Sequence, residues 1–154
     1  MYQKIMVPLD GSELAECVLP HVEAIARGCL PKEVIFVRAV ETTKDMRYPV
    51  AVLSDDVIKH IESEGKAAAE NYLRQLVDRV SYDGVNIRWE VIQGMVADSI
   101  SEYATKKGVD LIVIATHGRS GISRWVFGGV ADRILRSACV PVLMVRAPGC
   151  AIGI

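Results

Sequence analysis

The fold is decided by residues 111–138, which read LIVIATHGRSGISRWVFGGVADRILRSA. The apolar run from Leu111 to Ile114 predicts a buried strand, and the residues from Val130 onward predict a helix. A turn with several glycines lies between them. Glycine lets a ligand approach the backbone closely, and a helix N-terminus adds unpaired N–H donors and the positive end of a dipole. The unit therefore predicts a phosphate site, with a plain surface loop as the alternative, because neither common phosphate-loop motif is present.

Strands and helices alternate outward from this unit. Short apolar runs predict strands at 4–9, 33–40, 86–92, 111–115 and 140–145. Helical periodicity predicts helices at 12–27, 55–80, 97–107 and 129–138. In the first helix we expect Ser12 as the N-cap, a kink at the interior Pro20 and Gly28 as the C-terminal cap. Pro141 favours an edge position, or the start of its strand, for the last strand.

This alternation predicts an α/β fold. It is a doubly wound, five-stranded parallel sheet with helices on both faces, and right-handed crossovers leave few strand orders. In an order of 3-2-1-4-5 the winding reverses between the first and fourth strands, where such sheets bind ligands. The turn from Pro8 to Ser12 and the segment 115–129 both lie there, which strengthens the prediction of a phosphate or nucleotide site.

Composition limits the function classes. A chain of 154 residues with 51% hydrophobic content predicts a single domain, residues 1–154, with a tail at 147–154. The net charge of -1 argues against nucleic acid as an obligate partner. No apolar run is long enough to span a membrane, and no signal peptide is apparent, so we expect a cytoplasmic protein. The four cysteines have no C-x-x-C spacing and the histidines are scattered, so we expect free thiols and no metal site.

Four segments together resemble the universal stress protein family, over nearly the whole chain. They are Ile5-Met6-Val7-Pro8-Leu9-Asp10-Gly11-Ser12, Val109-Asp110-Leu111-Ile112-Val113, Thr116-His117-Gly118-Arg119-Ser120-Gly121 and Val140-Pro141-Val142-Leu143-Met144-Val145. The resemblance implies a five-stranded parallel sheet with strand order 3-2-1-4-5. It also implies an adenine nucleotide as the ligand, since many members bind ATP, while others do not.

ATP-binding members share the pattern G-x-x-G-x(9)-G-[ST]. Laid on this chain, its positions fall on Ala115, Gly118, Gly128 and Gly129, so the first glycine and the final hydroxyl are both replaced. A lost hydrogen bond to a charged group corresponds to about one to two decades of affinity. We therefore expect weakened binding of ATP, ADP or AMP, with or without Mg²⁺.

The same resemblance implies the remaining site residues. It places Pro8, Leu9 and Asp10 around adenine and ribose, and Asp10 has the chemistry to accept hydrogen bonds from ribose hydroxyls; the alternative is that Asp10 only shapes its turn. The other expected positions are Ala39 at the adenine edge, Ile114 under the nucleotide, and Arg119 and Val130 near the phosphates. We expect His117 to shape the loop, and we assign no catalytic residue.

Three functions stay open. The first is a nucleotide-binding stress-response regulator, the second an interaction module of the same fold without nucleotide, and the third a slow ATPase. Hydrolysis is the least favoured, because no acidic residue precedes Asp132 near the glycine loop. The resemblance also suggests a homodimer, paired antiparallel through the edge strand from Val140 to Val145.

Overall fold

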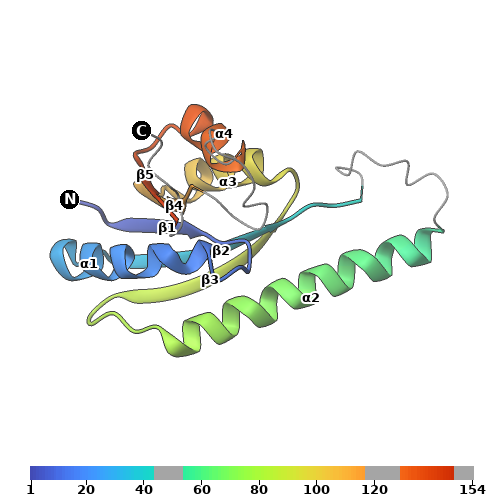
Figure 1. Ribbon diagram of the computed structural model, residues 1–154, viewed down its shortest axis with the longest axis horizontal. Helices are drawn as coiled ribbons and strands as arrows, with labels where there is room; N and C mark the ends of the chain where they lie inside the picture. The colour runs from blue at the N-terminus through green and yellow to red at the C-terminus, as the bar shows by residue number, and fades with distance from the viewer. Residues whose placement is uncertain (44–53, 117–128, 148–154) are drawn as a thin grey trace, which may run out of the picture.

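A computed structural model describes residues 1–43, 54–116 and 129–147 (Figure 1). The five strands are β1 (Lys4–Pro8), β2 (Glu33–Val40), β3 (Asn86–Gln93), β4 (Leu111–Ala115) and β5 (Val142–Val145). The helices in the described ranges are the 3₁₀ helix η1 (Ala15–Val18), α1 (Leu19–Cys29), α2 (Asp55–Arg79), α3 (Val96–Lys107) and α4 (Gly129–Ser137). Strands and helices alternate as the sequence predicts.

The strands form one sheet in the order β3-β2-β1-β4-β5, and every neighbouring pair is parallel. The predicted α/β class and strand order are therefore confirmed. β1 is the central strand: Met6 lies opposite Ile35 of β2 on one side and Ile112 of β4 on the other. The Asp110 carboxylate fixes the start of this pairing, because its two oxygens accept the backbone N–H groups of Gln3 at 2.7 Å and Lys4 at 3.1 Å.

Helices cover both faces of the sheet (Figure 1). Side chains alternate along a strand, so β1 and β4 each contribute to two apolar clusters. The first cluster contains Val7 and Val113 together with buried side chains of α1 and α2. The second contains Met6 and Ile112 together with buried side chains of α3 and α4. This burial on both faces explains why apolar residues dominate β1, β2 and β4 instead of alternating with polar ones.

The predictions about the interior and the C-terminal end of the first helix are wrong. The chain enters it through η1, and α1 begins only at Leu19, so Pro20 lies in the first turn rather than in the interior. At that position the missing N–H has no intrahelical partner to lose, so proline is tolerated without a kink. Gly28 lies within α1, and the C-cap is Leu30 in the left-handed conformation with φ 47°, its N–H donating to the Ala26 carbonyl.

The last strand is shorter than predicted, since β5 begins at Val142 rather than at Val140. Pro141 lies just before the strand and contributes its carbonyl, which accepts the Ile112 N–H at 2.9 Å. The prediction that β5 is an edge strand is confirmed. Within the described ranges no helix has the length and apolar character needed to cross a membrane.

Candidate functional site

The candidate site is the carboxyl edge of the sheet beside β1 and β4. These two strands are parallel neighbours, with Met6 opposite Ile112. Pro8 and Ile114 each lie two residues farther along their strands, so both strands reach this edge together. Leu9 continues the edge beyond β1, because its N–H donates to the Val37 carbonyl of β2 at 2.8 Å. The structure therefore brings the turn after β1 next to the start of the glycine-bearing segment.

The turn after β1 is held by its own side chains. The Asp10 Oδ1 accepts the Ser12 N–H at 2.9 Å and the Ser12 hydroxyl at 2.6 Å, and the Ser12 Oγ accepts the Ala15 N–H at 3.2 Å. Gly11 between them has φ +85°, which L side chains rarely adopt. Ser12 thus supports the start of η1, although it is not the N-cap of a long helix as predicted. Asp10 shapes this turn at the carboxyl edge.

The site residues predicted on the strands divide between the two faces. Ile114 is 7% exposed and belongs to the apolar cluster under α3 and α4, against which Ala39 also packs. Ala115 is 8% exposed and belongs to the opposite cluster, together with Leu9. These residues meet at one edge, but their side chains are mostly core. A ligand there would therefore contact mainly backbone and the polar turn.

The N-terminus of α4 is the predicted phosphate end of the candidate site. Gly129 begins this helix and Val130 follows it, and both are exposed. Among the described residues, no heavy atom would lie within 4 Å of a Cβ built on Gly129. The first N–H groups of a helix lack intrahelical partners and can bind an anion. The predicted site residues Gly118, Arg119 and Gly128, and also His117, lie outside the described residues.

A polar cluster that the sequence pattern did not single out adjoins the turn. The Arg38 guanidinium carbon of β2 lies 5.5 Å from the ring centre of Tyr72 on α2. The Tyr72 hydroxyl donates to Glu16 Oε1 at 3.0 Å, and Arg79 pairs with the other Glu16 oxygen at 2.6 Å. Burial, then the hydrogen bond to Glu16 and its charge, raise the pKa of Tyr72. The available sequence signal was a single arginine inside an otherwise apolar strand.

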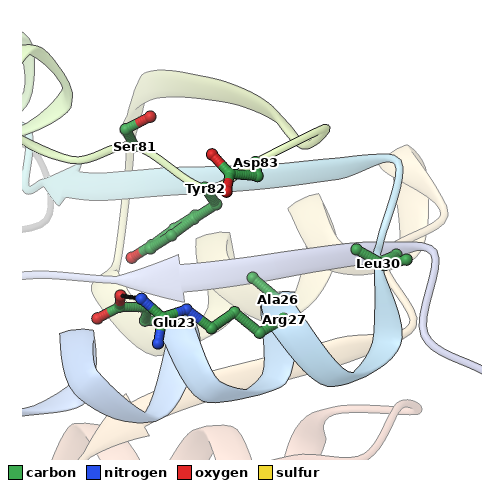
Figure 2. Close-up of a pocket in the computed structure, with 7 residues that line it drawn as sticks. All are labelled: Glu23, Ala26, Arg27, Leu30, Ser81, Tyr82 and Asp83. Carbon is green, nitrogen blue, oxygen red and sulfur yellow. Dashed lines mark hydrogen bonds and ion pairs between the residues drawn. The ribbon is translucent and has the colours of Figure 1, made fainter.

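A separate pocket of about 400 Å³ lies at the amino ends of the strands, opposite the candidate site. It is bordered by the end of α1 and by the turn before β3, with Glu23, Ala26, Arg27, Leu30, Ser81, Tyr82 and Asp83 as its lining (Figure 2). In Figure 2 the Tyr82 ring points toward Glu23 on α1. The Tyr82 hydroxyl is buried without a hydrogen-bond partner among the described residues. None of the predicted site residues borders this pocket.

Comparison with known proteins agrees with the fold and with the sequence resemblance. The family model "Universal stress protein family" matches residues 1–146. Universal stress protein MJ0531 of Methanocaldococcus jannaschii is 32% identical over 148 residues, which cover 96% of this chain and 84% of that protein.

Two solved structures share the architecture. MJ0577 of the same archaeon has a TM-score of 0.73 at 27% identity, covering 97% of this chain and 99% of that chain. An Arabidopsis thaliana family protein with AMP bound has a TM-score of 0.66 at 17% identity, covering 96% and 93% respectively. The chain belongs to the universal stress protein family.

Proposed function

We propose that this protein binds an adenine nucleotide at the carboxyl edge of the sheet and acts as a regulator in a stress response. The observation that carries the proposal is the adjacency of β1 and β4, which puts the Asp10 turn beside the carboxyl end of β4. This is the point where the winding of the sheet reverses and where open α/β sheets bind ligands.

The chemistry of the described residues fits such a ligand. The Asp10 carboxylate has the acceptor character that ribose hydroxyls need, and the N-terminus of α4 at Gly129 offers N–H donors for a phosphate. Ala39 and Ile114, which belong to the same apolar cluster, supply apolar surroundings for the base. The Arabidopsis protein of the same fold with AMP bound supports adenine as the base. Mg²⁺ would accompany the phosphates if the ligand is ATP.

Calorimetric titration with ATP, ADP and AMP, each with and without Mg²⁺, tests the proposal. Binding of at least one nucleotide below millimolar concentration is the expected result. No heat with any of them would favour the interaction module of the same fold. Measuring phosphate release from bound ATP then separates a regulator from a slow ATPase.

Gly129 gives a sharper test through a matched pair of variants. Gly129→Ser adds a hydroxyl donor at a position where no atom of the described residues lies within 4 Å of the new Cβ. A hydrogen bond to a charged group is worth up to about one to two decades of affinity. Gly129→Ala adds the Cβ without the hydroxyl and serves as the control. We expect ATP to bind more tightly to the serine variant than to the alanine variant. Equal affinities would show that this position does not contact the phosphates.

We also propose a homodimer that pairs through β5. This strand is at the sheet edge, and Leu143 on it is 38% exposed. An uncovered edge strand presents N–H and C=O groups to any neighbouring strand. Antiparallel pairing of two identical edges satisfies both copies with one self-complementary contact.

A further inference from the structure

Arg38 packs directly against the turn that presents Asp10. A Cβ built on Gly11 would lie 2.9 Å from the Arg38 Nη1 and 3.1 Å from its Cζ. The guanidinium therefore covers the Gly11 backbone on the side where any other residue would carry a side chain. This position follows from strand alternation on β2. Ala39 packs on the face covered by α3 and α4, so the preceding residue, Arg38, lies on the opposite face, which α1 and α2 cover.

Tyr72 also packs against the Arg38 guanidinium. The 5.5 Å separation between the Arg38 Cζ and the Tyr72 ring centre is a cation–π distance. The ring is itself fixed, because its hydroxyl donates to Glu16, which Arg79 also pairs. The Asp10 charge contributes to the raised pKa of Tyr72, so the Asp10 carboxylate is close enough to act on the same cluster.

We propose that Arg38 is a positioning residue for ribose recognition, because its guanidinium lies against both the Tyr72 ring and the Gly11 backbone and so fixes the turn that carries Asp10. The inference rests on the proposed nucleotide function and deepens it. Arg38 acts through the turn and does not itself contact the sugar. A planar guanidinium can cover a peptide and stack on a ring at once, whereas a lysine ammonium is a compact point charge. Arg38→Lys should therefore not restore what Arg38→Met loses.

The first experiment compares ATP with 2′,3′-dideoxy-ATP, which lacks both ribose hydroxyls of the sugar. The ratio of the two dissociation constants isolates ribose recognition from general loss of affinity. We expect wild-type protein to prefer ATP by about tenfold or more, the effect of a hydrogen bond to a carboxylate. Arg38→Met should bring this ratio close to one. Tyr72→Phe keeps the ring and should keep most of the preference, whereas Tyr72→Leu should lose it.

Arg74 offers a matched control. It also lies over an aromatic ring, that of Trp89 on β3, at 6.0 Å, and so makes the same kind of contact between α2 and the sheet. Arg74→Met should leave the ribose preference unchanged. If Arg38→Met keeps the wild-type ratio, or if Arg74→Met reduces it equally, the inference is wrong.

A second readout needs no nucleotide. Amide hydrogen exchange of Ser12 reports on the turn, because this N–H is bonded to the Asp10 carboxylate. We expect exchange at Ser12 to be about tenfold faster in Arg38→Met than in wild type or Arg74→Met. If exchange at Ser12 were the same in Arg38→Met as in wild type, Arg38 would not stabilise the turn and the inference would be wrong. If exchange is faster but wild-type protein binds neither nucleotide, the proposed function fails, and the ribose role of Arg38 fails with it.

Discussion

Two tyrosines in this protein have opposite hydrogen-bonding situations, and removing their hydroxyls should have opposite effects on stability. Tyr82 is 8% exposed, and its hydroxyl has no hydrogen-bond partner in the described ranges. Tyr72 donates its hydroxyl to the Glu16 carboxylate at 3.0 Å. Tyr82→Phe and Tyr72→Phe delete the same atom, so the two variants compare a buried hydroxyl without a partner against one with a charged partner.

The magnitudes follow from these contacts. A buried polar group without a partner costs roughly 1–3 kcal/mol, and the void left by one oxygen costs less than about 0.5 kcal/mol. Tyr82→Phe should therefore raise the free energy of unfolding by about 0.5–2.5 kcal/mol. A hydrogen bond to a charged group is worth roughly 1.5–3 kcal/mol. Tyr72→Phe should lower the free energy of unfolding by an amount near the lower end of this range, because Arg79 still neutralises the Glu16 charge.

Urea unfolding at neutral pH measures both changes. With a slope of about 1–3 kcal/mol per molar urea, a difference of about 2–4 kcal/mol between the two variants should separate their midpoints by roughly 1 M or more. If the urea midpoint of Tyr82→Phe fell as far below that of wild type as the midpoint of Tyr72→Phe, the reasoning would be refuted. It would show that the Tyr82 hydroxyl is as well bonded as that of Tyr72.

Alkaline pH gives an independent check on Tyr82. Burial, with a smaller contribution from the Glu23 charge, raises the pKa of Tyr82 to about 12. The folded protein then keeps a phenolic proton that the unfolded chain loses near pH 10. The free energy of unfolding is therefore unaffected by this titration below pH 10 and falls as the pH rises from 10 toward 12. In Tyr82→Phe the loss of unfolding free energy across this window should be smaller than in wild type.

Two further predictions concern the turn and the sheet edge. Gly11→Ala should lower the free energy of unfolding by about 1–2 kcal/mol, because φ is +85° at this position and L residues are strained there; a loss no larger than that of Gly84→Ala, where φ is +73° and the space is open, would show that contact with Arg38 adds nothing. Leu143→Lys should convert the proposed dimer to a folded monomer in sedimentation, whereas Val57→Lys, an equally exposed apolar position on α2, should not; a wild-type monomer at micromolar concentration would rule out the dimer.

The sheet was predictable because its signals are redundant. Buried parallel strands appear as continuous apolar runs, and the helices between them have glycine or polar boundaries. Gly108 is an example: it caps α3 in the left-handed conformation with φ 64°, and the sequence pattern marks a turn there. With right-handed crossovers, few strand orders remain. The predicted carboxyl edge, with the Asp10 turn beside β4, followed from that order.

The errors arose where local rules compete. Periodicity did not separate the 3₁₀ helix η1 from the α-helix that follows it, so Pro20 was expected in the helix interior and lies instead in the first turn of α1. The preference of helix C-termini for glycine favoured Gly28 as the cap. The helix continues to Cys29, and Leu30 adopts the left-handed conformation with φ 47°. The role of Arg38 was not predicted, because its contact with Tyr72 depends on how α2 packs on the sheet, and sequence spacing does not show this packing.

The central place of β1 also affects how the chain acquires its structure. This strand is made first, yet one of its two neighbours, β4, enters more than a hundred residues later; the Lys4 and Asp110 contact alone spans 106 positions. Closing so long a loop has a large entropic cost before any contact forms, which slows folding. During synthesis, β1 paired with β2 would expose an apolar strand edge until β4 arrives, and such edges recruit other chains. The yield of native protein should therefore depend on what shields that edge on the ribosome.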